Sequence, residues 1–284
     1  FAIDGNKTSG TKFISDVISK GASAIISNKK IKNYNSKTPL IVVKDVRKSL
    51  SEACSNFYNK KPDNIIAVTG TNGKSSVVNF FYQILNINKM SVASIGTLGV
   101  SSKNYNTKTN LTSMDPLSLH KNLQILSKNK TKNVILEASS HGLDQKRLDN
   151  LNINTAIFTN LSHDHLDYHK NMQLYFNSKL YLFKNLLKKN SKIITDEDNK
   201  EFKIIKKIAI KRKIKKITIG TKSGNIRILY NKYKQNKQIV KILIGSRICE
   251  LEVPLIGYFQ VKNLLMAILT ASLCGLSINK IFNQ

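Results

Sequence analysis

The amino-acid sequence predicts an α/β fold, in which a central parallel sheet of the P-loop type with crossover helices follows a small partial α/β domain. Short apolar runs alternate along the chain with stretches of helical apolar spacing, as a parallel sheet requires. A glycine-rich turn joins one of these runs to a helical stretch. Polar residues cluster directly after several runs, where parallel sheets gather ligands beyond the carboxyl ends of their strands.

Residues 1–61 are predicted to form the small domain. Its expected elements are helical stretches "GTKFISDVISKGA" (10–22) and "VRKSLSEACSNFY" (46–58), and buried strands "SAIIS" (23–27) and "PLIVV" (39–43). The polar stretch "NKKPD" (59–63) is predicted to be a linker, because Pro62 cannot extend a helix.

Residues 62–284 are predicted to form the larger domain. The expected parallel strands are "IIAV" (65–68), "SVASIG" (91–96), "NVILEA" (133–138), "TAIFTN" (155–160) and "KIITD" (192–196). A few antiparallel strands, "NIRILY" (225–230), "QIVKILIG" (238–245) and "ICELEV" (248–253), precede an expected final helix at 263–274.

The chain is strongly basic, with Lys+Arg 46, Asp+Glu 17 and a formal net charge of +29. Such a charge suggests nucleic acid, an anionic membrane or a phosphate-rich ligand. Here the lysines are scattered, whereas a nucleic-acid binder gathers charge into a stripe with interleaved aromatic residues, so specific nucleic-acid binding is not expected. We interpret the densest basic run, "IIKKIAIKRKIKKITIG" (204–220), as a solvated face between core positions.

The cysteines and the apolar runs bear on the cellular compartment. Cys54, Cys249 and Cys274 lie far apart without CxxC spacing, which favours a reducing cytoplasm over a disulfide framework. The longest apolar stretch, residues 264–276, is too short to span a bilayer. We therefore expect no membrane partner, and a monomer.

The strongest local signal is the strand, turn and helix in "IIAVTGTNGKSSVVNFFYQIL" (65–85). Backbone amides of such a turn face a phosphate, Lys74 supplies a full positive charge and Ser75 can ligate Mg²⁺. The strict GxxxxGK[ST] pattern has glycine where Val68 stands. The residues expected to contact a nucleotide are Gly70, Thr71, Asn72, Gly73, Lys74 and Ser75.

A second polar cluster follows the expected strand at 133–138. Glu137 would stand at its carboxyl end, where a carboxylate could help to hold Mg²⁺; an exposed strand-end glutamate is the alternative. The following stretch offers hydrogen-bond donors and one fixed cation suited to a carboxylate or phosphate, namely Ser139, Ser140, His141, Gln145 and Arg147.

Three of the five histidines lie in "LSHDHLDYH" (161–169). The stretch comes close to the HxHxDH metal signature of metallo-β-lactamase-fold hydrolases. However, Tyr168 separates Asp167 from His169, and no histidine follows His169 in the chain. The sequence therefore disfavours a binuclear zinc hydrolase.

Taken together, "TGTNGKSS", "EASSHGLDQKRL", "TNLSHDHLDYH" and "YFNSKLYLF" closely resemble the Mur ligase family. Within it they resemble the branch that adds the third amino acid to UDP-N-acetylmuramoyl-L-alanyl-D-glutamate in peptidoglycan synthesis. The likeness implies that 1–61 is the end of the uridine-binding N-terminal domain and that 62–284 is most of the central ATPase domain. The C-terminal amino-acid-binding domain would begin beyond Gln284, so we expect this chain alone to show little turnover.

The resemblance also implies roles for individual residues. Lys74 and Ser75 would bind ATP phosphates and Mg²⁺, and Glu137 and His165 would be further metal contacts. Lys179 matches the lysine that family members carry as a carbamate, which supports a second Mg²⁺. The residues implied to hold the muramoyl-dipeptide substrate are Thr112, Ser113, Ser139, Gln145 and Arg147, and Asn263 would lie near the nucleotide base.

The sequence departs from the family pattern at a few positions. His163 stands where Arg is usual, Ser113 and Met114 replace a common Thr-Pro pair, and Gln260 stands where Asn is usual. The first change could weaken a contact to phosphate.

The implied activity is ATP-dependent amide-bond formation through an acyl phosphate, with meso-diaminopimelate as the expected third residue. Positioning and charge neutralisation carry such a reaction, which needs glycines, a lysine, Mg²⁺ ligands and an arginine, and no side-chain nucleophile. Two alternatives remain open from the sequence. One is another ligase of the superfamily, such as folylpolyglutamate synthetase or a different Mur ligase; the other is a basic nucleic-acid-binding module.

Overall fold

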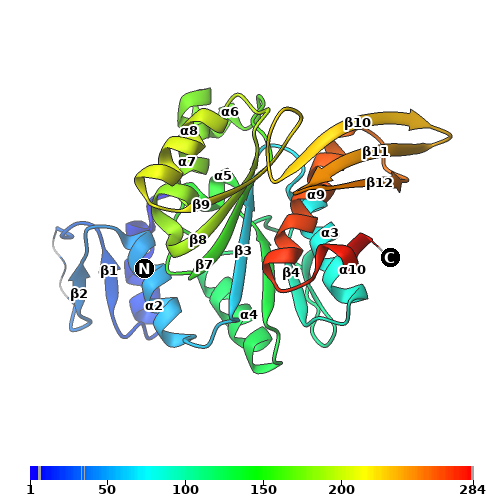
Figure 1. Ribbon diagram of the computed structural model, residues 1–284. Coiled ribbons are helices and arrows are strands. Elements are labelled where there is room, and N and C mark those ends of the chain that lie inside the picture. The colour runs from blue at the N-terminus through cyan, green and yellow to red at the C-terminus, as the bar shows by residue number, and fades with distance from the viewer. Residues whose placement is uncertain (6–7, 33, 35, 283–284) are drawn as a thin grey trace.

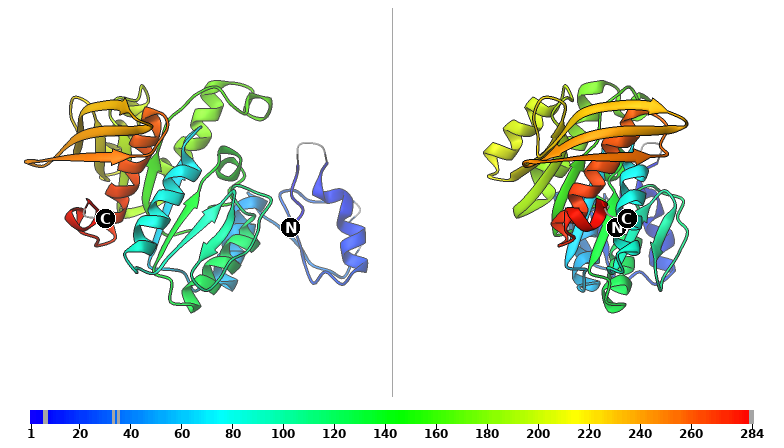
Figure 2. Two further views of the ribbon diagram at one scale, coloured as in Figure 1. Left: turned by 90° about the vertical axis from the view of Figure 1, so that its right-hand side faces the viewer. Right: turned by 45° about the vertical axis from the view of Figure 1, so that its right-hand side comes forward.

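The computed structural model describes residues 1–5, 8–32, 34 and 36–282. A ten-stranded sheet flanked by helices forms the larger part, and a two-stranded sheet lies near the N-terminus (Figure 1). The N-terminal unit lies at one end of the molecule and the last three strands of the large sheet lie at the other (Figure 2). Within these described residues, no helix is long and apolar enough to cross a membrane.

The N-terminal unit pairs two short parallel strands beside its helices. Its elements are η1 (Gly10–Phe13), α1 (Ile14–Ser19), β1 (Ile25–Ser27), β2 (Leu40–Val42) and α2 (Val46–Phe57). The expectation that both strands are buried is wrong for the second, because Ile41 and Val42 are 47% and 48% exposed. The small hydrophobic cluster of this unit takes in Ile25 and Leu40 and leaves those two side chains outside.

The large sheet has the order β12-β11-β10-β9-β8-β7-β3-β6-β4-β5. The strands from β10 to β4 in this order pair in parallel, and β5, β11 and β12 are antiparallel to their neighbours. The strands are β3 (Asn64–Thr69), β4 (Val92–Gly96), β5 (Gly99–Ser102), β6 (Asn133–Glu137), β7 (Ile153–Phe158), β8 (Leu187–Asp196), β9 (Lys215–Gly220), β10 (Ile226–Lys234), β11 (Lys237–Ile244) and β12 (Arg247–Val253). The predicted mostly parallel α/β sheet is thus confirmed.

Two strands were not predicted. Strand β5 is short and follows β4 through a two-residue turn that places Gly99 at φ 98°. Strand β9 lies inside the basic run at 204–220, where alternating lysine and isoleucine hide the change from helix to strand. The run is a solvated face between core positions, as expected, because its lysines are exposed or half-buried while Ile205, Ala209, Ile217 and Ile219 are buried.

Helices cover both faces of the sheet. The helices are α3 (Lys74–Ile87), α4 (Pro116–Lys128), α5 (Ser140–Asp144), α6 (Leu166–His169), α7 (Met172–Tyr181), the π-helix η2 (Leu182–Leu186), α8 (Phe202–Lys211), α9 (Tyr258–Leu273) and α10 (Ile278–Phe282). Helix α9 begins five residues before the expected start, in "GYFQVKN".

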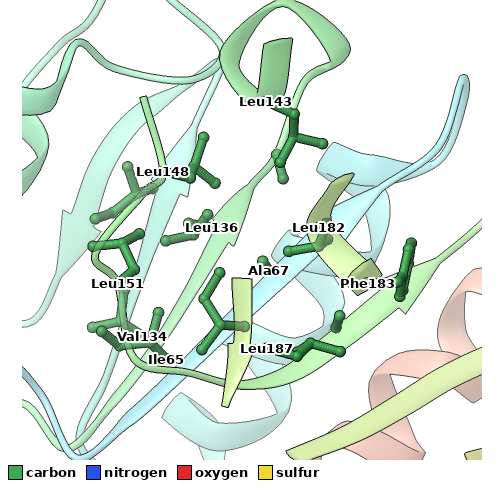
Figure 3. Packing of buried hydrophobic residues seen from close by; sticks show 14 of the residues in the cluster. Ile65, Ala67, Val134, Leu136, Leu143, Leu148, Leu151, Leu182, Phe183 and Leu187 are labelled. Carbon is green, nitrogen blue, oxygen red and sulfur yellow. The ribbon is translucent and has the colours of Figure 1, made fainter. Parts of the chain in front are cut away.

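The large sheet has a hydrophobic core on each face, and successive side chains of strand β3 point alternately into one core and the other. Ile66 and Val68 face α3 and α9, and Ile65 and Ala67 face the side of α4, α5 and α7. Figure 3 shows the second core, where Leu136 on β6 lies among side chains of the helices and loops above it. The central strand is therefore buried on both faces, and its carboxyl end leads into the glycine-rich loop.

Hydrogen bonds from α2 and from the residues that follow it attach the N-terminal unit to the larger part. Ser51 Oγ donates a buried hydrogen bond of 2.6 Å to the carbonyl of Asp149. Lys61 Nζ donates to the carbonyl of Asn150 at 3.2 Å. These bonds fix α2 beside the loop that follows the second polar cluster.

We expect Ser51→Ala to lower the free energy of unfolding by about 1–3 kcal/mol, because the buried carbonyl of Asp149 loses its donor. Urea unfolding measures the change. Ser49→Ala on the same helix is the matched control, since the Ser49 hydroxyl makes no hydrogen bond to the described residues. Equal stability of the two variants would contradict the role of this bond.

Candidate active site

The loop after β3 is shaped by two glycines. Gly70 has φ 150° and Gly73 has φ 85°. A Cβ on Gly70 would lie 1.9 Å from Thr159 Oγ1, and one on Gly73 would lie 2.6 Å from Asn263 Oδ1. Both positions therefore require glycine, for backbone conformation as well as for space.

This loop is hydrogen-bonded along its length to the segment that follows β7. The amides of Thr71 and Asn72 donate to the carbonyl and the Oδ1 of Asn160, each at 2.9 Å. Thr159 Oγ1 donates to the carbonyl of Asn72 at 2.6 Å, and Thr71 Oγ1 accepts from the Ser162 amide at 3.0 Å. The segment 159–162, which leads into the histidine-rich stretch, thus holds the glycine-rich loop in place.

Two lysines converge on one carbonyl oxygen of the loop. Lys74 Nζ donates to the carbonyls of Gly70 at 3.1 Å and Thr71 at 2.8 Å. Lys179 Nζ reaches the same Gly70 oxygen at 2.8 Å and lies 4.2 Å from the centre of the Tyr175 ring. The Lys179 side chain is only 1% exposed. The predicted pair, 105 residues apart in the sequence, is brought together here.

Burial governs the charge of Lys179. Loss of solvent, together with the nearby Lys74 charge, lowers the pKa of its amine to about 6, while Asp164 opposes the shift. Burial also lowers the pKa of Lys74. Near neutral pH the Lys179 amine is therefore largely unprotonated, which makes it a nucleophile.

Glu137 is buried at the carboxyl end of β6, with 3% exposure, which excludes the alternative of a solvent-exposed glutamate. Its Oε2 accepts from Ser75 Oγ at 3.0 Å, and its Oε1 accepts from the Thr97 amide at 2.9 Å. Thr97 Oγ1 donates in turn to Thr112 Oγ1 at 3.2 Å. A Cβ on Gly96 would lie 2.2 Å from Glu137 Oε1, so the neighbouring strand leaves just enough room for this carboxylate.

A hydrogen-bond network extends from Glu137 to the predicted substrate residues. Ser113 Oγ donates to the Glu137 carbonyl and accepts from the Ser139 amide, both at 2.9 Å. Arg147 donates to the Ser113 carbonyl and to Gln145 Oε1, both at 2.7 Å. These side chains form one continuous polar surface from the glycine-rich loop toward α2.

This polar surface ends in a cavity of about 180 Å³ between the N-terminal unit and the larger part. Arg147 and Gln145 line it from one side, and Arg47 of α2 lines it from the other. Burial lowers the pKa of Arg147, and the Arg47 charge acts in the same direction. Asp115 lines the same cavity and opposes this shift, so the lining carries two guanidinium groups and one carboxylate.

His165 stands apart from the other predicted metal contacts. Its backbone is left-handed at φ 51°, its side chain is 46% exposed, and its Nε2 lies 3.4 Å from Asp164 Oδ2. Its ring lies 4.8 Å from that of His141. Among the described residues, no hydrogen bond or ion pair joins it to Glu137 or Ser75.

The remaining histidines of that stretch differ from one another. His163 is exposed, whereas His169 is buried and its ring lies 5.3 Å from that of Tyr175. Throughout the described ranges, no group of three or more His, Cys, Asp or Glu side chains is placed to hold a metal ion. Ser75 and Glu137 instead offer hard oxygen donors, which suit Mg²⁺ when phosphates complete its coordination.

Some residues of the site were not predicted. Thr97 binds the buried carboxylate, and Tyr175 contacts both Lys179 and the Thr71 hydroxyl, at 3.1 Å from the latter. A usable signal existed for each, because Thr97 follows the expected strand at 91–96 and Tyr175 lies one helical turn before Lys179. Asn263 is buried with its Nδ2 3.1 Å from Gln260 Oε1.

A mostly parallel sheet that carries a glycine-rich loop at its carboxyl edge is the architecture of α/β nucleotide-binding proteins. Residues 68–271 match the Mur ligase middle domain, and the chain belongs to the Mur ligase family.

Relatives and solved structures agree with this assignment. The UDP-N-acetylmuramoyl-L-alanyl-D-glutamate--2,6-diaminopimelate ligase of Rickettsia montanensis is 44% identical over 232 residues, which are 80% of this chain and 48% of that protein. A solved structure of a ligase of the same name has a TM-score of 0.83 and 28% identity, over 96% of this chain and 56% of that one. The Thermotoga maritima MurF ligase in complex with ADP shares the fold, with a TM-score of 0.62 and 19% identity over 100% and 62% of the two chains. The chain spans about half the length of the curated relatives it matches.

The pKa of Lys179 predicts how stability depends on pH. Between about pH 6 and pH 10.5 the unfolded chain binds a proton at this lysine that the folded chain does not, so stability rises with pH by up to about 1.4 kcal/mol per unit. Lys179→Met should remove this rise. Urea unfolding in CO₂-free buffer at several pH values measures the effect.

Lys184→Met, at an exposed lysine shortly after Lys179, is the matched control and should keep the native pH dependence. If native protein and Lys179→Met gave parallel curves, the buried amine would not be the neutral group that we infer.

Proposed function

We propose that this chain is the substrate-activating part of a ligase that joins meso-diaminopimelate to UDP-N-acetylmuramoyl-L-alanyl-D-glutamate in peptidoglycan synthesis. The observation that carries the proposal is the convergence of Lys74 and Lys179 on the Gly70 carbonyl, beside a buried Glu137. The names of the 36–45% identical relatives support the choice of substrates. Residues 1–61 would be the end of the N-terminal domain and 62–284 the central one, with the amino-acid-binding domain supplied by further chain.

The glycine-rich loop would hold the nucleotide. ATP supplies the phosphoryl group that turns the D-glutamyl carboxylate into an acyl phosphate, which the amine of the third residue then attacks. Lys74 Nζ, now bound to two carbonyls of its own loop, would exchange them for phosphate oxygens. The amide groups of Gly73, Lys74 and Ser75, at the start of α3, would donate to the same phosphates, while those of Thr71 and Asn72 stay bound to Asn160, and Asn263 would lie near the base.

The donor set at Ser75 and Glu137 fits Mg²⁺. Both groups are hard oxygen donors that already share a hydrogen bond of 3.0 Å, and Mg²⁺ in phosphate sites uses one or two carboxylates together with phosphate oxygens. When bound, the ion would neutralise phosphate charge. His165 would have to move toward this pair to become a ligand, since its side chain is now 46% exposed.

Lys179 fits the chemistry of a carbamate. Its amine is buried and largely neutral near pH 7, so it can add CO₂ and change from a base into an anion. That anion would stand beside Lys74, where the present structure has two basic side chains around one carbonyl oxygen. The modification would therefore give Lys74 an anionic neighbour and a second Mg²⁺ an oxygen ligand.

The hydrogen-bond network that extends from Glu137 to Arg147 would bind the muramoyl-dipeptide substrate. Arg147 and Gln145 would hold a carboxylate of the muramoyl dipeptide, with Ser113 and Ser139 as further donors and Thr112 nearby. The network begins at Glu137, which lies beside the glycine-rich loop. The reacting carboxylate of the muramoyl dipeptide would therefore lie between that loop and Arg147. The three cysteines are free, which agrees with the reducing cytoplasm where such substrates would be met.

The test of this function uses the full-length protein with both substrates. Lys74→Ala should lower substrate-dependent ADP release by about three orders of magnitude, because the phosphates lose their fixed cation. Lys121→Ala, an exposed lysine on α4, is the control and should stay at the native rate. Near-native ADP release by Lys74→Ala would refute the assignment of the loop, and release that depends on a folate substrate instead would refute the proposed acceptor.

The carbamate has its own test. Native protein equilibrated with ¹³C-bicarbonate should show a carbamate carbonyl resonance that is missing from Lys179→Ala. Added acetate or formate should restore part of the lost activity of that variant, because a free carboxylate can take the place of the carbamate. A resonance that persists in Lys179→Ala, or an unaffected turnover, would contradict the proposal.

A further inference from the structure

Helix α8 turns a basic face to solvent. Lys203, Lys206, Lys207 and Lys211 are exposed. Lys206 and Lys207 lie three and four residues after Lys203, and Lys211 lies four residues after Lys207, so the four share one side of the helix with Ile210 among them. The opposite face is fixed in the core, where Ile205 is fully buried. The helix packs against η2 and against the interior strands β8 and β9 of the large sheet.

The basic surface continues past the end of the helix. Arg212 donates to the carbonyls of Phe183 at 2.8 Å and Leu187 at 2.7 Å, which ties the end of α8 to the beginning of β8. Further exposed lysines flank this junction. We call the α8 patch the set formed by Lys184, Lys188, Lys189, Lys203, Lys206, Lys207, Lys211, Lys213 and Lys215 with Ile204 and Ile210.

The charge of the α8 patch is not used inside the protein. The ion pairs between described residues involve Lys20, Lys237, Lys262 and His165, and none involves the patch. Much of the patch lies at the amino ends of β8 and β9, whereas the glycine-rich loop follows the carboxyl end of the parallel strand β3. The lysines at these amino ends, Lys188, Lys189, Lys213 and Lys215, therefore lie at the opposite edge of the sheet from the glycine-rich loop.

We propose that the α8 patch is a docking surface for an anionic phospholipid bilayer. Clustered lysines on an amphipathic helix attract anionic headgroups, and apolar side chains among them can enter the boundary between headgroups and acyl chains. Ile204 and Ile210 are 45% and 63% exposed on α8. Single-stranded nucleic acid would instead favour exposed aromatic side chains, which stack on bases.

This proposal revises two expectations from the sequence. The run at 204–220 was interpreted as a solvated face, but its lysines join others from η2 and β8 into one surface only in the folded chain. No membrane partner was expected because no segment can span a bilayer. Docking at the surface requires no such segment.

Co-sedimentation of the whole chain with vesicles tests the proposal. Binding to vesicles of phosphatidylglycerol and phosphatidylcholine should exceed binding to phosphatidylcholine alone and should fall as salt is added. A variant with Lys203→Gln, Lys207→Gln and Lys211→Gln should bind the anionic vesicles roughly a hundredfold more weakly. The matched control carries Lys232→Gln, Lys234→Gln and Lys241→Gln, the same loss of charge on the exposed side of β10 and β11, and should bind like the native chain.

Ile210→Ser distinguishes a bilayer from a polyanion. It should weaken vesicle binding several-fold and leave binding to single-stranded RNA unchanged, because only a bilayer takes up the isoleucine. Circular dichroism confirms that each variant is folded. Equal losses in the two triple variants would show a general effect of net charge and overturn the proposal. Binding to RNA that depends on the α8 lysines, without vesicle binding, would overturn it in favour of nucleic acid.

Discussion

The hydrogen bonds between the glycine-rich loop and the segment after β7 are the constraint on which the site depends. Asn160 and Thr159 fix the backbone at Thr71 and Asn72, and this fixes the direction of the Gly70 carbonyl. That oxygen in turn orders both lysine side chains. Adjacent parallel strands end at the same edge, so these bonds need only short loops. They use the amides of Thr71 and Asn72 and leave those of Gly73, Lys74 and Ser75 to face a ligand.

The site keeps two ionisable side chains away from water and gives them different partners. Glu137 can be buried because an amide and two hydroxyl groups lie around its oxygens. Lys179 has one carbonyl and an aromatic ring for partners, and its burial lowers the pKa of its amine. The same loop thus lies beside a fully hydrogen-bonded carboxyl group and a neutral, nucleophilic amine.

Much of this arrangement was open to prediction from the sequence, because the apolar runs of the parallel strands and the glycine-rich turn are local signals. Strand β5 has no such local signal, because four residues after a tight turn are too few to show a periodicity. Strand β9 was missed because lysines alternate with its isoleucines. Glu137, Ser113 and Arg147 could be chosen by type and position, yet their shared network depends on contacts between distant segments. The exposure of His165 could not be foreseen, since it follows from a left-handed backbone that its sequence neighbours do not require.

The open edge of the large sheet at β12 affects how the protein behaves in concentrated solution. Strand β12 pairs on one side with β11 and is the outermost strand of its end of the sheet. An open strand edge invites the strands of other molecules, and the usual outcome is aggregation. Along β12, Arg247, Glu250 and Glu252 place charges of both signs at intervals. A second copy that paired with β12 in parallel and in register would bring like charges together, so these side chains oppose that way of extending the sheet into a neighbouring molecule.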